Sequence, residues 1–368
     1  MRVLFVIAHL DKGGGQAIQA AQLFDRLAPQ VDGEMICLKT HSNGSRPLTA
    51  GRLTEVGNLR FPSGVWELRR AIEARRGRFD IVQAFDAYYA LPACRFARAR
   101  PLVVRFGAHP TEDLASRYGL PGRTAMRLVN PWLLSGTTIV VNAPQLIDAL
   151  PGRSAKLIPN GVDLSRFSAS PNRVGARRSL GLPPDVPLIC YTGKIIPRKS
   201  VDELYRALRD ISDLHLLLVG TDNEPFYGDG YHRAIRKEFS EVLPRVHHVG
   251  EVSPEAIPRY LEASDLFVFP SRLEGMPNSV LEAMAAGLPV IASDTPAHRS
   301  LGLTEVGRLY RSQGELADAI RGLMGSAEMR KQMSSGSRKL VEQRFSFEAA
   351  CSAYLELYRS LTANRAAS

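Results

Sequence analysis

The sequence predicts two doubly wound, parallel-sheet α/β domains that follow one another along the chain. Short continuous apolar runs recur in both halves, for example VLFVIA at 3–8 and LLLV at 216–219. Runs of this kind, without polar alternation, are typical of strands buried on both faces of a parallel sheet. Amphipathic segments of helical period separate the runs, and 368 residues are enough for two hydrophobic cores.

The first half alternates between strands and helices from its first residues onward. Residues 3–8 are an expected strand, and residues 15–28 (GQAIQAAQLFDRLA) are an expected crossover helix. The other expected strands of this half are 81–85, 102–106, 138–142 and 156–160. A stretch rich in proline, glycine, serine and asparagine then follows at 159–187, and this composition is typical of a connection between domains.

The second half repeats the alternation and ends on a long helix. Its expected strands are 188–193, 215–220, 247–250, 266–270 and 289–293, and its expected helices are 200–211, 254–264 and 314–325. The final helix begins after Ser346, which is a suitable N-cap. An apolar stripe of helical period follows, made of Phe347, Cys351, Tyr354, Leu355 and Tyr358.

The composition is that of a soluble globular protein, with 45% hydrophobic and 23% charged residues. No window approaches the roughly 18 apolar residues that a membrane span needs. The N-terminal apolar run ends in a glycine-rich turn, so we interpret it as a first strand and not as a signal peptide. Four scattered cysteines without CxxC pairing suggest neither a disulfide framework nor a zinc site, and a reducing cytosol is the expected location.

The net charge of +10 is concentrated in arginine clusters of the first half. The clusters lie at 69–79, 95–100 and 123–127. They suit an anionic lipid surface, nucleic acid or a phosphorylated substrate, and a solvated basic helix face explains them equally well. No RNA-binding aromatic motif or zinc finger accompanies them, so we do not expect nucleic acid and rank a membrane surface above it.

Two loops that follow expected strands suit an anionic ligand. In LDKGGGQ, three glycines from Gly13 to Gly15 would let the backbone approach a ligand beside a helix N-terminus, although a tight turn alone explains them too. In the stretch YTGKIIPRKSVDEL, the cations Lys194, Arg198 and Lys199 suit a diphosphate. The alternative for this second loop is an exposed, incidentally basic turn.

The stretch SRLEGMPNSVLEAMAAGLPVIASD, residues 271–294, places Glu274 and Glu282 eight residues apart around a turn. Pro277 suits the first turn of the helix that follows, and the N–H groups of that turn suit an anion. Two carboxylates beside an anion site would repel a phosphate, but they would accept hydrogen bonds from a neutral polyol such as a sugar. The alternative is that Glu282 complements the helix dipole and Glu274 caps the turn.

This stretch resembles the E-x7-E signature of the retaining glycosyltransferases of family 4, the glycosyl transferases group 1, which have the GT-B fold. Other segments agree in the same order, namely the glycine loop, IPNGVD, TGKIIPRK, LLLVG, HHVGEVS and YLEASDLFVFPSR. The likeness covers nearly the whole chain. It implies two Rossmann-like domains facing a central cleft: an acceptor-binding domain at 1–165, completed by helix 346–364, and a nucleotide-sugar-binding domain at 166–345.

The resemblance also implies roles for individual residues. Glu274 would contact the hydroxyls of the donor sugar, Glu282 the ribose, and the backbone at 249–251 the base. The cations would neutralise the diphosphate leaving group, so that no metal or other cofactor is needed. The residues implied for the reaction are Glu274, Lys199, Lys194 and His109. Those implied for donor binding are Gly14, Gly15, Arg198, Gly250, Glu251, Gly275, Met276, Pro277, Asn278, Ser279 and Glu282.

The sequence departs from the family pattern at several positions. Lys194 replaces the usual arginine, which keeps the charge but loses the bidentate fork. Ser200 stands where glycine is usual, and the segment DTPAHRSLG at 294–302 lacks the acidic residue common there.

The histidine of the first domain is also displaced. His109 lies two positions past the family's histidine, whose place Gly107 occupies. His109 would still reach the cleft, or Arg105 or Asp113 would substitute for it. The alternative is an ordinary exposed loop histidine.

We therefore expect a cytoplasmic, retaining hexosyltransferase that uses a UDP-, GDP- or ADP-sugar. Its acceptor would be a lipid-linked, polysaccharide or other glycan, with peripheral binding to the inner face of the membrane through the arginine clusters. Two alternatives stay open. One is a sugar-nucleotide epimerase or phosphorylase of the same fold, and the other is a catalytically silent subunit that binds nucleotide sugars.

Overall fold

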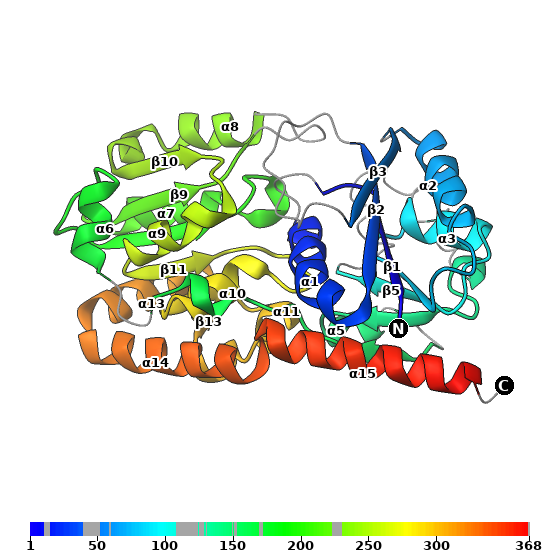
Figure 1. Ribbon diagram of the computed structural model, residues 1–368. Helices are drawn as coiled ribbons and strands as arrows, with labels where there is room; N and C mark the ends of the chain where they lie inside the picture. The colour runs from blue at the N-terminus through cyan, green and yellow to red at the C-terminus, as the bar shows by residue number, and fades with distance from the viewer. Residues whose placement is uncertain are drawn as a thin grey trace. The chain divides into compact units, whose positions relative to one another are not determined.

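The computed structural model describes residues 1–10, 15–39, 52–58, 60–107, 124, 129, 131–148, 150, 153–168, 172–222 and 230–366. The chain divides into two units (Figure 1), one of Met1–Gly161 with Phe347–Ser368 and one of Val162–Ser346. The division falls four residues before the predicted boundary at 165/166. The reason is that the Val162 N–H donates to the Phe345 carbonyl at 2.8 Å, so the chain joins the second unit directly after Gly161.

The first unit contains a parallel sheet in the order β3-β2-β1-β4-β5-β6-β7. Its strands are β1 (Val3–Ile7), β2 (Gly33–Lys39), β3 (Leu53–Asn58), β4 (Ile81–Ala84), β5 (Leu102–Phe106), β6 (Thr138–Val141) and β7 (Ala155–Leu157). Every residue of β1, β4 and β5 is buried, as their continuous apolar sequences predict. Its helices include α1 (Gly15–Val31), α2 (Ser63–Glu73), α3 (Ala90–Phe96), α5 (Gln145–Asp148) and α15 (Phe347–Ala366).

The C-terminal helix α15 is part of the core of the first unit. Its predicted apolar stripe is buried, and Cys351, Tyr354, Leu355 and Tyr358 pack in one hydrophobic cluster with α1 residues such as Phe24 and Leu27. The Tyr358 hydroxyl donates to Gln83 Oε1 at 3.1 Å, so the helix also satisfies a buried polar side chain of β4. Helix α15 therefore packs as part of the first unit.

The second unit contains a parallel sheet in the order β10-β9-β8-β11-β12-β13. Its strands are β8 (Leu188–Thr192), β9 (His215–Val219), β10 (Val246–Gly250), β11 (Leu266–Phe269), β12 (Val290–Ser293) and β13 (Arg308–Tyr310). Its α-helices are α6 (Arg173–Ser179), α7 (Asp202–Asp210), α8 (Gly230–Glu238), α9 (Ile257–Glu262), α10 (Asn278–Ala285), α11 (Pro296–Ser300), α12 (Leu303–Val306), α13 (Gln313–Gly325) and α14 (Ala327–Arg344). Short 3₁₀ segments are η1 (Leu164–Arg166), η2 (Pro197–Lys199), η3 (Ser240–Arg245) and η4 (Pro254–Ala256).

The strand order of the second sheet determines where a ligand site can form. The order reverses between β8 and β11, which are neighbours in the sheet although, within the described residues, α7, β9, α8, β10 and α9 separate them in sequence. In open α/β sheets, ligands bind beyond the carboxyl ends of the strands at such a reversal. The loop that follows β8 holds the three cations named above, the loop that follows β11 holds Glu274, and the next helix, α10, holds Glu282.

Two parallel-sheet domains with intervening helices are thus confirmed. Across the described ranges, no helix is long and apolar enough to cross a membrane. The four cysteines are buried free thiols.

Asp86 fixes the start of α3 and is expected to matter for stability. Its Oδ1 accepts from the N–H groups of Tyr88, Tyr89 and Ala90 at 2.7 to 3.1 Å, and its Oδ2 accepts from Ala8 N–H at 2.8 Å. We expect Asp86→Ala to lower the free energy of unfolding by about 2 to 4 kcal/mol, because these backbone donors would lose a charged acceptor. Urea unfolding measures this difference. The exposed Asp148 on α5 is the matched control, since Asp148→Ala should change stability by less than about 0.5 kcal/mol. Equal effects of the two substitutions would contradict the prediction.

Candidate functional site

A buried ion pair joins the loops that follow β8 and β11. Lys199, the last residue of η2, donates from Nζ to Glu274 Oε1, and the two side chains are only 12% and 11% exposed. The Ser271 hydroxyl donates to the same carboxylate oxygen at 2.5 Å. Arg198 lies 3.8 Å from it and donates to the Leu273 carbonyl at 3.0 Å. The predicted cations and the first predicted glutamate therefore meet at the sheet reversal.

The surroundings favour the ionised form of Glu274. Burial would raise the pKa of this carboxyl, but the charges of Lys199 and Arg198 and the bonds from Lys199 and Ser271 lower it overall. The pKa of Lys199 is itself lowered, first by burial, while Glu274 acts in the opposite direction. Lys199 Nζ lies 4.9 Å from the centre of the Phe269 ring, which accounts for part of that burial. A cation held in this way is desolvated in advance for an anionic group.

Ser200, where the family pattern has glycine, ends η2 in the left-handed conformation with φ = 50°. Glycine adopts this conformation at little cost, and serine does not. The departure noted in the sequence therefore lies at a position where backbone geometry explains the usual glycine.

The second predicted glutamate lies on α10 and has a cationic partner. Arg166 Nη1, from η1, is 3.7 Å from Glu282 Oε1, and the side chains are 19% and 20% exposed. Arg166 also donates to the carbonyl of Pro254, which opens η4 shortly after β10. Burial raises the pKa of Glu282 to about 7, and Arg166 acts in the opposite direction. Glu282 is thus a carboxyl that titrates near neutral pH.

Arg338 of α14 fixes the backbone around this pair. Its Nη1 donates to the carbonyls of Phe167 and Ser168, directly after η1, at 3.2 and 3.1 Å. The same nitrogen donates to the Ala285 carbonyl at the end of α10 at 2.9 Å. Arg338 therefore clamps the segment that bears Arg166 to the helix that bears Glu282.

A buried histidine is linked through hydrogen bonds to the loop that holds Glu274. His298 Nδ1 lies 2.6 Å from the Ser293 carbonyl, which makes this nitrogen the hydrogen-bond donor. The Ser293 hydroxyl donates to the Ser271 carbonyl at 2.5 Å, and Ser271 in turn holds Glu274. Burial lowers the pKa of His298, which favours the neutral ring. We interpret His298 as a positioning residue.

The other predicted donor residues of the second unit lie around the same strand ends. Gly250 closes β10 with φ = 81°, and Glu251 after it is exposed. Lys194 is half-buried in the loop after β8. Residues 275–279 turn the chain into α10, with Gly275, Met276 and Pro277 buried and Asn278 and Ser279 half-buried. Pro277 precedes α10 in an extended conformation (ψ = 111°), so the prediction that it forms part of the first turn was wrong by one position.

Some of the predicted site residues belong to the first unit, and the structure describes only part of these. Gly13, Gly14, His109 and Asp113 lie outside the described residues, and Gly15 begins α1. Arg105, suggested as a substitute for the histidine, is 3% exposed and donates to Asn160 Oδ1. This side chain completes a buried polar network, which accounts for it without a catalytic role.

Sequence reasoning missed Arg166, Arg338 and His298. Arg166 lies only three positions after the NGVD segment that carried the resemblance, so its place in the linker was a usable signal. His298 lies in DTPAHRSLG, a segment noted in the sequence only for the acidic residue that it lacks. Arg338, in the polar helix α14, has no local signal at all.

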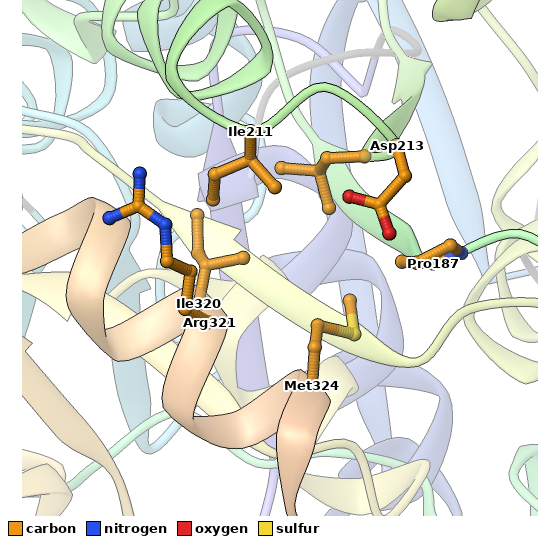
Figure 2. A pocket seen from close by; sticks show the side chains of 7 residues that line it. Pro187, Ile211, Asp213, Ile320, Arg321 and Met324 are labelled. Carbon is orange, nitrogen blue, oxygen red and sulfur yellow. The ribbon is translucent and has the colours of Figure 1, made fainter.

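A separate cavity of about 180 Å³ lies elsewhere in the second unit (Figure 2). Its lining includes Pro187 and Leu214, which directly precede β8 and β9, together with Ile320 and Met324 of α13. It therefore lies at the amino ends of the strands, away from the loops that hold Lys199 and Glu274. It is not the site built by the charged residues.

Comparison with known proteins gives a consistent result. Residues 173–340 match the family model described as glycosyl transferases group 1. A GDP-mannose-dependent monoacylated alpha-(1-6)-phosphatidylinositol monomannoside mannosyltransferase of Corynebacterium glutamicum is 27% identical over 206 residues, 52% of each chain. Across the curated relatives compared, the matched part covers 36% to 60% of their length.

Solved structures match over nearly the whole chain. Sucrose-phosphate synthase from Thermosynechococcus elongatus has a TM-score of 0.84 at 23% identity, covering 99% of this chain and all of that one. The Anabaena protein Alr3699/HepE in complex with UDP-glucose has a TM-score of 0.79 at 21% identity, covering 98% of this chain and all of that one. At these identities the likeness shows the fold alone. The fold is that of GT-B glycosyltransferases, and residues 173–340 resemble the glycosyl transferases group 1 family.

Proposed function

We propose that this protein is a retaining hexosyltransferase of glycosyltransferase family 4 that uses a nucleotide-diphosphate sugar and needs no metal. The observation that carries the proposal is the pairing of Lys199 with Glu274 at the sheet reversal, together with Glu282 eight residues later on α10. The named relatives agree in substrate type. One is GDP-mannose-dependent, and one neighbour was solved with UDP-glucose.

The residues of the second unit suit the two ends of such a donor. Lys199, Arg198 and Lys194 are cations at one strand end and would stabilise the charge that develops on the departing diphosphate. Glu282 would accept hydrogen bonds from the ribose hydroxyls. Arg166 bridges Glu282 and the Pro254 carbonyl, so it would set the spacing between the ribose and the base subsite at 249–251.

The proposed reaction exchanges one glycosidic bond for another on the same face of the sugar. The bond between C1 and the phosphate oxygen breaks, and the nucleoside diphosphate leaves with the electron pair. The acceptor oxygen bonds to C1 from the same face, and its proton passes to the departing phosphate oxygen. Glu274, whose Oε1 accepts from Lys199 and Ser271, would orient the sugar through its hydroxyls and form no covalent intermediate.

We assign acceptor binding to the first unit. The acceptor would be a lipid-linked, polysaccharide or other glycan. The relatives include enzymes whose names specify a phosphatidylinositol mannoside acceptor or a role in lipopolysaccharide core biosynthesis. We place the reaction in the cytoplasm, where nucleotide sugars are available.

A thermal-shift panel of UDP-, GDP- and ADP-hexoses tests the donor site. We expect one base to raise the melting temperature of the parent protein, and we expect Glu282→Ala to abolish that rise. A ligand at 100 times its Kd stabilises a protein by about 2.7 kcal/mol, which such a panel detects easily. The absence of a shift with every donor, under saturating conditions, would overturn the proposal.

Product analysis of the same samples separates the alternatives. A transferase should release the nucleoside diphosphate by slow donor hydrolysis or by transfer to an added glycan. An epimerase would convert the sugar without releasing nucleotide, and a silent binding subunit would return the donor unchanged.

A further inference from the structure

The exposed face of α2 and α3 carries a stack of aromatic rings flanked by arginines. Trp66 of α2 stacks on Phe96 of α3 with ring centroids 5.1 Å apart, and Phe96 lies 5.3 Å from Trp132. The guanidinium of Arg69 lies 5.2 Å from the Trp66 ring, and that of Arg95 lies 5.4 Å from the Trp132 ring. We call these five side chains the aromatic–arginine face. All belong to the first unit, in which α2 and α3 lie side by side (Figure 1).

The rings of this face are open to solvent. Trp66, Phe96 and Trp132 are 44%, 39% and 46% exposed, and Phe61 just before α2 is 71% exposed. Large aromatic side chains normally bury most of their surface, and a cluster of exposed ones marks an interaction site. Since Trp66 and Trp132 are the protein's two tryptophans, both indoles lie on this face.

The charge around the rings is strongly positive. Residues 61–100 hold eight arginines and four acidic residues. Each acid has a partner: Glu67 accepts from Asn58 N–H, Glu73 pairs with Arg69, Asp80 pairs with Arg2, and Asp86 caps α3.

The arginines divide into inward and outward ones. Arg75 pairs with Glu34 at 2.6 Å and supports the sheet, so it does not contribute to the face. Arg70 and Arg100 are exposed. Arg70 lies one turn from Trp66 on α2, and Arg100 lies close enough to Arg95 to lower its pKa, after the larger effect of burial.

We propose that the aromatic–arginine face docks this protein on an anionic phospholipid bilayer. Tryptophan rings prefer the headgroup level of a bilayer, where an amphipathic ring has both apolar and polar surroundings. Guanidinium groups beside them match phosphate oxygens with paired N–H donors. The face combines both features on α2, α3 and Trp132, which packs beside Phe96. Its excess of arginine complements a negatively charged surface and gives no attraction to a neutral one.

Intrinsic fluorescence tests this directly, because every tryptophan reports on the face. On adding vesicles of phosphatidylcholine with about one third phosphatidylglycerol, the emission should shift to shorter wavelength. Lipids brominated on their acyl chains should quench it. Vesicles of pure phosphatidylcholine should bind at least about tenfold more weakly.

Two matched double variants separate a local from a global charge effect. Arg70→Glu/Arg100→Glu should weaken vesicle binding at least about tenfold, since each surface arginine contributes about fivefold. Arg178→Glu/Lys237→Glu makes the same change in net charge on exposed positions of the second unit, and should weaken binding less than about threefold. Sedimentation of Trp66→Ala/Trp132→Ala with the same vesicles should fall without a change in melting temperature.

Three results would overturn the proposal. They are an unchanged emission spectrum with anionic vesicles, equal losses in the two charge variants, and lipid-free self-association that shields the tryptophans from an aqueous quencher. The last would assign the face to a second copy of the chain. No donor is present in these measurements, so they are independent of the outcome of the thermal-shift panel.

Discussion

Lys199→Met is expected to lower the rate of sugar transfer by about 100- to 1,000-fold, measured with the donor that the thermal-shift panel identifies. Methionine keeps an unbranched apolar side chain of nearly the same length but removes the cation, which lies over the Phe269 ring and would face the departing diphosphate. Donor affinity should fall less than the rate, because the charge on the leaving group is greatest in the transition state. Steady-state kinetics that separate kcat from KM measure this difference.

The same substitution leaves Glu274 with a weaker set of partners. Arg198 at 3.8 Å and the Ser271 hydroxyl remain, so the free energy of unfolding should fall by about 1 to 3 kcal/mol, less than for a buried charge with no partner. Lys199→Met/Glu274→Gln should recover most of that stability and stay inactive. A folded Lys199→Met protein with near-parent kcat would show that Lys199 serves the structure alone.

The sequence predicted most strands of both sheets, including the edge strands β7 and β10, and missed β2, β3 and β13. β2 has an apolar run of only four residues, 35–38, with the charged residues Glu34 and Lys39 on either side of it. β3 is half-buried along most of its length, and β13 has only three residues. Such strands are defined by pairing with a neighbour already in place, and that pairing is not a local property of the sequence.

Part of the candidate site could be predicted from local sequence, and the rest depends on contacts between distant segments. Lys199 and Glu274 lie shortly after strands, and Glu282 lies on the helix that follows the second of them, so their approximate places came from the order of elements. Their partners came from distant segments. Arg166 is more than a hundred residues from Glu282, and Arg338 reaches both through backbone carbonyls on two separate segments. Spacing along the chain predicts which residues reach one sheet edge, and only the fold shows how they pair.

Glu282→Gln is expected to stabilise the protein and to weaken its binding of the donor. The pKa of Glu282 in the folded chain is about 7, above its ordinary value near 4.5. In the folded protein, the carboxyl therefore holds its proton where the unfolded chain has lost it. The resulting stabilisation is fully present below pH 4.5 and is lost as the pH rises through 7. Glutamine, which carries no charge, avoids this loss, and at pH 8 it should raise the free energy of unfolding by about 1 to 3 kcal/mol.

Urea unfolding between pH 5 and 8 measures this effect. The difference in stability between the variant and the parent should grow with pH across this window, in which Glu282 ionises. Glu241→Gln, at an exposed position of the same unit, is the control and should show no such trend. A pH-independent difference for Glu282→Gln would mean that the carboxyl titrates normally.

Donor binding should respond to pH in the opposite direction. If the ionised Glu282 accepts from the ribose hydroxyls, the parent's KM for the donor should fall as the pH rises through about 7, because that is where the carboxylate forms. Glu282→Gln should lose this dependence and bind the donor about 10- to 100-fold more weakly at pH 8, since a hydrogen bond to a charged group contributes about 1.5 to 3 kcal/mol.

A variant that gains stability but keeps the donor affinity of the parent would place Glu282 outside the donor site. A variant that loses affinity without gaining stability would mean that Arg166 already compensates the buried charge in full. Only the combination of both effects identifies a carboxylate that is retained for binding at a cost to stability.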